Sequence, residues 1–157
     1  MLRLFAWLFL LLLAGCGQLP ATSPPEALSA AREKGQDVVL YALSLIDTGY
    51  RYGGKNPEAG LDCSGMVSYV FKHAVGMNLT GDAADIARAG RPVDLAKLRP
   101  GDLVFFNTLD KPYSHVGIYI GAGRFVHAPS TNGRVRTDSL KNGYFAARLE
   151  AARSYFN

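Results

Sequence analysis

The spacing of apolar residues changes along this chain, and the change limits the folds open to it. In the first half, apolar side chains recur at intervals of three and four residues, as on one face of a helix. Beyond Pro100-Gly101 they alternate with polar side chains, as in half-buried strands. Helices followed by strands predict an α+β domain whose helices pack on a curled antiparallel sheet.

The same pattern predicts individual elements. Helices are expected over residues 26–47, from residue 63 onward, and over residues 82–89, with Asp62 placed to be the N-cap of the second helix. The strands are expected over residues 102–106, 114–120, 124–128, 134–137 and 148–155. Short connectors such as Gly121-Ala122-Gly123 and residues 131–133 predict antiparallel hairpins.

The N-terminus has the shape of a secretory signal. Arg3 precedes an apolar run over residues 4–14, which is about half the length that a membrane-spanning helix needs. Leu13-Ala14-Gly15-Cys16 resembles the lipobox of bacterial lipoproteins, in which the cysteine thiol receives a diacylglycerol and becomes the first mature residue. The alternative is an ordinary signal peptide that happens to contain a cysteine. Gly17, in place of Asp, resembles the lipoproteins sorted to the outer membrane.

Three regions follow from this pattern. Residues 1–15 are expected to be the lipoprotein signal peptide, residues 16–30 the lipidated N-terminus and a flexible tether rich in Pro and small residues, and residues 31–157 one globular domain. Without the signal the chain has sixteen basic and thirteen acidic side chains, a net charge of +3. The basic residues form no dense block, so a nucleic-acid partner is not expected, whereas a weakly basic protein suits the anionic cell wall.

Cysteine use singles out one thiol. The chain has two cysteines, and lipidation of Cys16 would leave Cys63 unpaired. An unpaired thiol in an oxidising compartment needs either a reactive role or burial; a Cys16–Cys63 disulfide is the alternative. Cys63 falls in the first turn of its helix, where the helix dipole lowers a thiol pKa, but Asp62 opposes this effect. A histidine partner is therefore still needed.

Three histidines are available for that partnership. His73 lies about 15 Å further along the same helix as Cys63, too far to contact the thiol, and is expected at the surface. Alternation places His115 opposite the apolar Val116, on the face predicted to line a cleft. His127, on the next strand, could accept a hydrogen bond from the second ring nitrogen of His115. Purely structural histidines, or a zinc site with Cys63, are the alternatives.

Five segments together resemble the signature blocks of a known family, in order and spacing. They are Tyr50-Arg51-Tyr52-Gly53-Gly54, Asp62-Cys63-Ser64-Gly65, residues 98–106, residues 114–121 and Phe125-Val126-His127-Ala128. The chain is similar in them to the NlpC family of papain-like peptidoglycan endopeptidases. The resemblance covers the chain from about Val38 to its C-terminus.

The resemblance implies a papain-like catalytic domain that hydrolyses amide bonds in peptidoglycan stem peptides or crosslinks, next to D-amino acids or diaminopimelate. Cys63 would be the nucleophile, His115 the base and His127 the orienting third member of a Cys-His-His triad. Tyr52 matches a tyrosine whose hydroxyl points at the nucleophile in relatives. Asp62 and Ser64 match positions that touch substrate, although helix capping explains Asp62 equally well.

The mechanism that follows needs neither a metal nor an organic cofactor. Backbone N–H groups of Cys63 and Ser64 at the helix start are expected to hold the oxyanion, while His115 protonates the departing amine. Two other functions stay open: an amidase or acyltransferase on the same fold, and a non-catalytic lipoprotein that binds wall peptides. We expect a monomer that faces the periplasm and is held, through the lipid on Cys16, on the outer membrane.

Overall fold

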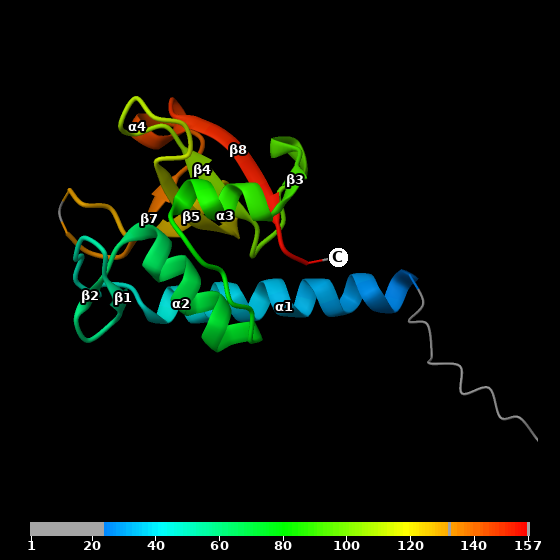
Figure 1. Ribbon diagram of the computed structural model, residues 1–157. Coiled ribbons are helices and arrows are strands. Elements are labelled where there is room, and N and C mark those ends of the chain that lie inside the picture. Colours follow the sequence, from blue (N-terminus) through cyan, green and yellow to red (C-terminus); the bar gives the residue numbers. More distant parts are fainter. Residues whose placement is uncertain (1–23, 132, 157) are drawn as a thin grey trace, which may run out of the picture.

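The computed structural model describes residues 24–131 and 133–156, and it places helices against one side of an antiparallel sheet (Figure 1). The predicted signal peptide and Cys16 lie outside these residues. In chain order the elements are α1 (Pro24–Ser44), β1 (Lys55–Asn56), β2 (Gly60–Leu61), α2 (Cys63–Val75), α3 (Ala83–Ala89), β3 (Arg91–Val93), a 3₁₀ turn (Leu95–Lys97), β4 (Leu103–Phe106), β5 (His115–Gly121), β6 (Arg124–His127), β7 (Arg136–Ser139), α4 (Gly143–Ala146) and β8 (Leu149–Ser154).

Six strands form the main sheet in the order β3-β8-β4-β5-β6-β7, with each neighbouring pair antiparallel. The register pairs Phe106 with His115 between β4 and β5, and His127 with Arg136 between β6 and β7. The strands that carry the two histidines are therefore neighbours at the middle of the sheet. The predicted α+β arrangement of helices on an antiparallel sheet is confirmed.

The two faces of the sheet bury different apolar clusters. On one face, side chains of α1 and α2 pack against β5, with Val67 and Val70 of α2 and Val116 and Ile118 of β5 all fully buried. On the other face Phe106 and Phe125 form a smaller cluster with partly buried side chains around it. Because successive residues of a strand point to opposite faces, the second face is also the one that carries His115 and His127.

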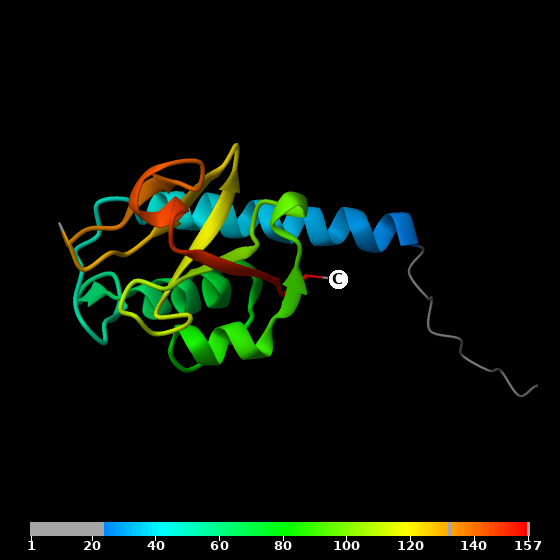
Figure 2. The same ribbon diagram turned by 90° about the horizontal axis from the view of Figure 1, so that it is seen from above.

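Helix α1 begins earlier than the sequence pattern predicts. It starts at Pro24, two residues before the predicted start at residue 26, so residues 26–30, which the sequence placed both in this helix and in the tether, are helical; the helix projects beyond the domain at this end (Figures 1 and 2). Pro24 and Pro25 stand in the first turn, where proline costs no hydrogen bond, and the residues that follow are rich in alanine. None of the helices in the described part of the chain combines the length and apolarity that crossing a bilayer requires.

Strand β7 also differs from its prediction, since it starts two residues later than expected. Arg134 and Val135 pair instead with the segment that follows α1: Val135 donates its N–H to the carbonyl of Thr48 and accepts from the N–H of Asp47. The shift brings Asp138 into the strand beside β6. Strand β3 and helix α4 were not predicted, because both are too short to show a hydrophobic period.

Candidate active site

Cys63 is the first residue of α2, and the residues around it fix where that helix begins. The carboxylate of Asp62 accepts a hydrogen bond of 2.6 Å from the N–H of Gly65, which makes Asp62 the predicted N-cap. Gly65 lies so close to the carbonyl oxygen of Gly54 that an added Cβ would stand 1.9 Å from it. The helix start is therefore packed directly against the glycine-rich loop before β1.

The Cys63 thiol lies at the junction of the helix start and β5. It accepts hydrogen bonds from the backbone N–H groups of Val116, Ser64 and Cys63 itself, and all three lower its pKa. Burial, followed by the negative charge of Asp62, has the larger effect and raises the pKa of the thiol to about 11. Val116 directly follows His115, so the sulfur lies against the backbone of β5 next to the residue predicted to be its base.

His115 and His127 form a hydrogen-bonded chain that ends on a carboxylate. Nε2 of His115 lies 2.8 Å from Nδ1 of His127, and Nε2 of His127 lies 2.8 Å from Oδ2 of Asp138. The guanidinium of Arg136 donates from Nε to the same Oδ2 at 3.0 Å. The structure therefore extends the predicted pair of imidazoles by two charged residues on β7.

This chain of contacts sets the tautomer of each ring. An ionised carboxylate only accepts, so His127 must donate from Nε2 and keep the lone pair on Nδ1. That lone pair accepts from Nε2–H of His115, which leaves Nδ1 of His115 as the basic nitrogen. In the described residues nothing hydrogen-bonds to this Nδ1. His115 is therefore held in the form that can take a proton from a thiol.

Burial keeps both imidazoles neutral. It lowers the pKa of His115 to about 3, helped by the positive charges of His127 and Arg136, and lowers the pKa of His127 to about 4. The carboxylate of Asp138 acts in the opposite direction on both rings. The thiol pKa is raised as well, so the shifts of Cys63 and His115 both favour a neutral thiol and a neutral imidazole in the substrate-free site.

Helix α4 covers the imidazoles on the outer face of the sheet. The ring centroid of Phe145 lies 5.6 Å from that of His115 and 4.5 Å from that of His127. Phe106 and Phe125 complete an aromatic wall behind the two rings. This wall accounts for the burial of the two imidazoles, with exposed fractions of 8% for His115 and 0% for His127.

The structure does not bring Tyr52 to the thiol, so this prediction was wrong. The Tyr52 side chain is 90% exposed and stands in a turn. Tyr50 is half-buried, and its backbone forms a bridge with Leu61, two residues before Cys63. Burial raises the pKa of Tyr50, and so do the nearby negative charges of Cys63 and Asp62. Tyr50 is therefore the tyrosine beside the nucleophile.

Asp62 and Ser64 flank the thiol as predicted, but both take part in capping the helix. Oδ1 of Asp62 accepts from the hydroxyl of Ser64 at 3.1 Å as well as from the N–H of Gly65. In the described chain no oxygen accepts from the N–H groups of Cys63 and Ser64. These two N–H groups point at the sulfur instead. Attack of the sulfur on a carbonyl would place the resulting oxyanion next to the sulfur, within reach of the same N–H groups.

The alternatives for the same atoms find no geometric support. Cys63 forms no disulfide within the described residues, and its proposed partner Cys16 lies outside them. Over residues 24–131 and 133–156, no three His, Cys, Asp or Glu side chains are arranged to hold a metal ion. His73 is exposed, as predicted, and its ring packs against Tyr69 with centroids 4.2 Å apart.

Comparison with known proteins agrees with this arrangement. The family model described as "NlpC/P60 family" matches residues 47–154. The chain is 39% identical over 121 residues to the gamma-DL-glutamyl hydrolase of Bacillus subtilis, covering 76% of this chain and 29% of that one. It is 36% identical over 151 residues to the "Probable endopeptidase NlpC" of Escherichia coli, covering 91% and 92%.

Solved structures show the same fold. The NlpC/p60 domain of the peptidoglycan hydrolase SagA superposes with a TM-score of 0.67 at 33% identity, covering 76% of this chain and 97% of that domain. Several curated relatives are longer, and the chain spans between 20% and 49% of the lengths of four of them. The fold is thus the papain-like α+β domain, and the chain belongs to the NlpC/P60 family.

Proposed function

We propose that this protein is a cysteine endopeptidase that hydrolyses amide bonds in peptidoglycan stem peptides or crosslinks. Two observations carry the proposal: the hydrogen-bonded chain from Asp138 through His127 to His115, and the hydrogen bond that the Cys63 sulfur accepts from the N–H of Val116, the residue that follows His115. The names of its relatives, among them peptidoglycan endopeptidases and a gamma-DL-glutamyl hydrolase, support the choice of substrate.

The first step is a proton transfer from Cys63 to Nδ1 of His115. The transfer leaves the net charge of the pair unchanged, so burial opposes it less than it opposes either ion alone. The thiolate is stabilised by the N–H groups of Val116, Ser64 and Cys63. The new imidazolium donates along the chain through His127 toward the negative charge of Asp138.

Attack on the scissile carbonyl forms the carbon–sulfur bond and places negative charge on the carbonyl oxygen. The N–H groups of Cys63 and Ser64 stabilise that oxyanion at the positive end of the helix dipole. His115 then gives its proton to the departing amine, which leaves an acyl-enzyme on the sulfur. A water molecule, deprotonated by His115, releases the acyl group and restores the thiol.

The test is digestion of purified muropeptides, followed by mass spectrometry of the fragments. Cys63→Ala and His115→Ala are each expected to remove detectable hydrolysis, while His73→Ala, a matched change at an exposed histidine, keeps the wild-type rate. The masses identify which amide bond is cut, and a fragment carrying an added amine in place of water would indicate an acyltransferase. Hydrolysis that persists in Cys63→Ala would exclude the proposed nucleophile.

We also propose that the chain is a lipoprotein anchored through Cys16, facing the periplasm from the outer membrane. The support is the sequence itself: the apolar run, the residues around Cys16 and the Gly that follows it. Mass spectrometry of the mature N-terminus should find Cys16 as the first residue with diacylglycerol attached. Cys16→Ser is expected to remove the modification and release the protein from the membrane fraction; an unmodified wild-type cysteine would refute the anchor.

A further inference from the structure

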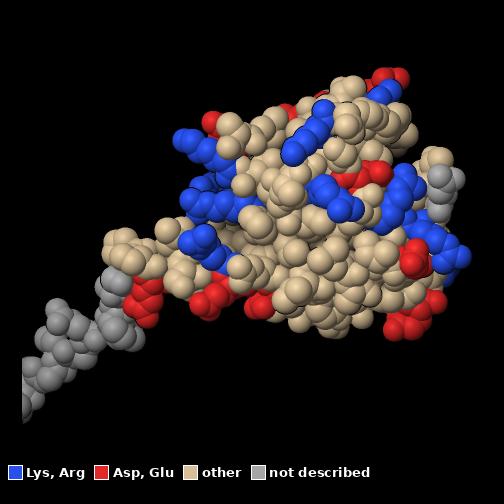
Figure 3. All heavy atoms as spheres, turned by 180° about the vertical axis from the view of Figure 1, so that it is seen from behind, with Lys and Arg blue, Asp and Glu red and all other residues tan. Residues whose placement is uncertain are grey.

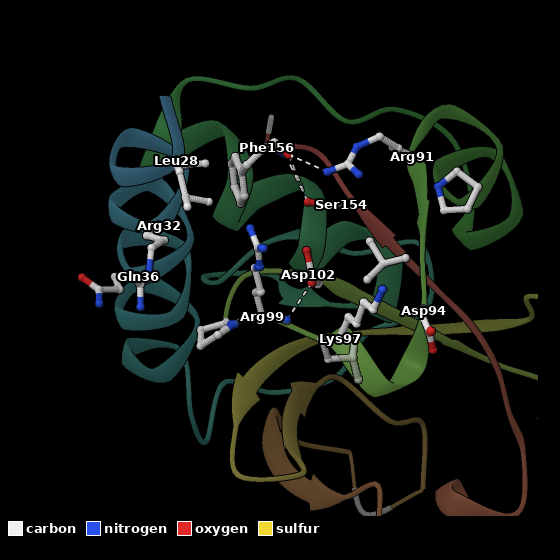
Figure 4. A pocket seen from close by; sticks show the side chains of 15 residues that line it. Leu28, Arg32, Gln36, Arg91, Asp94, Lys97, Arg99, Asp102, Ser154 and Phe156 are labelled. Atoms are coloured by element: carbon white, nitrogen blue, oxygen red, sulfur yellow. Dashed lines mark hydrogen bonds between the residues drawn. The ribbon is translucent and has the colours of Figure 1, made fainter. Parts of the chain in front are cut away.

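A pocket of about 630 Å³ lies between α1 and the edge of the sheet formed by β3 and β8. Figure 4 shows Arg32 on the α1 side of this space and Arg91, Lys97 and Arg99 on the side formed by β3 and the loop that follows it. We call these four side chains and the space between them the basic pocket. The sequence showed no dense basic block, because residue 32 lies far from the others along the chain.

The positive charges of the basic pocket are only partly balanced by the acidic side chains that line it. In the described part of the chain none of its four cations lies within ion-pair distance of a carboxylate. Two acidic residues line the same pocket, but Asp102 is only 3% exposed and accepts from the N–H of Arg99 at 2.8 Å, while Asp94 caps the 3₁₀ turn through the N–H of Ala96. The pocket therefore has a net charge of +2.

The surroundings keep that positive charge concentrated. At 100° per residue, the acidic residues Glu26, Glu33 and Asp37 of α1 face roughly away from Arg32 and the pocket. Figure 3 shows Lys and Arg side chains gathered beside the start of α1, with a row of acidic side chains just below them that runs along the helix. The electrostatic field at this end of the molecule therefore favours an anion.

The remaining lining is apolar. Leu28 on α1 and Phe156 at the end of the chain border the pocket, as do Val93 and Leu98. A site with cations around apolar side chains suits a ligand that has an anionic group joined to an apolar body, rather than a fully hydrated ion. Arginine forks, of which the pocket has three, bind phosphate oxygens through paired hydrogen bonds.

The pocket is separate from the candidate active site. Asp102, in its wall, precedes Leu103, which pairs with Ile118 at one end of the β4–β5 ladder, whereas His115 pairs with Phe106 at the other end. Three residues of strand, about 10 Å, divide the two ends. A ligand in the pocket would not touch the thiol, so both sites could be occupied at once.

We propose that the basic pocket binds the phosphate group of an anionic lipid headgroup on the membrane that carries the protein. The pocket is built on the first turns of α1, and only seven residues, 17–23, lie between Cys16 and Pro24. Such a segment spans at most about 29 Å even when fully extended. The choice of a lipid as the source of the phosphate rests on the proposed anchor at Cys16. The binding of phosphate by the pocket is independent of that anchor.

The test measures the binding of three phosphate-containing probes to the full chain in a non-ionic detergent. Binding is detected from the NMR chemical shifts of the backbone N–H groups. Three probes are compared: dihexanoyl phosphatidylglycerol, the zwitterionic dihexanoyl phosphatidylcholine, and inorganic phosphate. Phosphatidylglycerol should bind saturably and move the signals of the pocket residues. Arg32→Gln with Lys97→Gln should weaken it at least about tenfold. The matched pair Lys34→Gln with Lys72→Gln, two exposed lysines outside the pocket, should change it less than about twofold.

Each other outcome overturns a stated part of the inference. Phosphatidylcholine also carries a phosphate but has no net charge, so equal binding of both lipids would exclude an anionic headgroup as the preferred ligand. Equal loss in both double variants would exclude the basic pocket as the binding site. Inorganic phosphate binding as tightly as phosphatidylglycerol would exclude the headgroup as the ligand. Displacement of signals by an anionic muropeptide, but not by phosphatidylglycerol, would assign the pocket to a wall peptide. Because none of these measurements involves hydrolysis, their failure is distinguishable from failure of the proposed peptidase activity.

Discussion

Replacing Asp138 tests whether the carboxylate at the end of the imidazole chain sets the basicity of His115. In the wild type, Oδ2 of Asp138 accepts from both His127 and Arg136. Asp138→Ala removes the acceptor, and a hydrogen bond to a charged group contributes about 1.5–3 kcal/mol. Because the Asp138 side chain is 33% exposed and partly screened, we take about 2 kcal/mol, which corresponds to about a thirtyfold fall in kcat/KM.

The pH dependence separates an electrostatic role from a structural one. Asp138 raises the pKa of both His115 and His127, whereas Arg136 lowers both. Activity is lost on acidification when His115 binds a proton while Cys63 is still a thiol. The acid limb of kcat/KM should therefore move to lower pH in Asp138→Asn and to higher pH in Arg136→Gln.

The assay is steady-state hydrolysis of a purified muropeptide between about pH 3.5 and pH 9, with Asp37→Asn as a matched change at an exposed carboxylate of α1. KM should change little, because both residues are expected to act through the imidazoles. The reasoning is refuted if Asp138→Ala retains full activity, or if the acid limbs of the Asp138 and Arg136 variants move in the same direction.

Three further outcomes are expected. Gly65→Ala should lower the free energy of unfolding in urea by about 1–3 kcal/mol, because its Cβ would meet the Gly54 carbonyl. Phe145→Ala should admit water to His115 and His127, raise their pKa values and move the acid limb of activity to higher pH. Since both imidazoles are neutral when folded but protonate below about pH 6.5 when unfolded, stability should fall as pH decreases from 6.5 toward 4, by at most about 2.7 kcal/mol per pH unit.

Each of these has a clear contradiction. A Gly65→Ala protein with wild-type stability would mean that the loop before β1 can move away from the added Cβ at no cost in free energy. An unchanged acid limb in Phe145→Ala would show that α4 does not control the water around the imidazoles. For the stability measurement, His73→Asn should keep the wild-type dependence on pH, and a wild-type protein that gains stability on acidification would contradict the neutral state of the buried pair.

The sequence predicted those parts of the fold that depend on hydrophobic period. The core face of α2, the N-cap at Asp62 and the hairpin at Gly121-Ala122-Gly123 all follow local rules, and the structure has each of them. The start of α1 was misplaced because Pro24 and Pro25 were read as part of a tether, although proline also suits the first turn of a helix.

The candidate site was predictable only where residues stood on regular elements. His115 and His127 could be placed from strand alternation, and the structure brings them together. The sequence could not show which of Tyr50 and Tyr52 lies nearer the thiol, because the local turn decides which side chain is buried and which is exposed. Asp138 depended on a two-residue shift of β7. A signal was present, since an acidic residue on the strand after His127 is a candidate partner for it.

The neutral state of the resting site explains how an unpaired thiol can persist. Oxidation and disulfide exchange act on the thiolate, and a thiol whose pKa is raised to about 11 holds almost none of it at neutral pH. Catalysis does not need a standing thiolate, because Nδ1 of His115 can take the proton as substrate binds and Asp138 then balances the charge that forms on the rings. Burial disfavours both the Cys63 thiolate and the His115 imidazolium, and it thus protects Cys63 between turnovers. During a turnover, the carboxylate of Asp138 on β7 offsets the free-energy cost of forming the imidazolium.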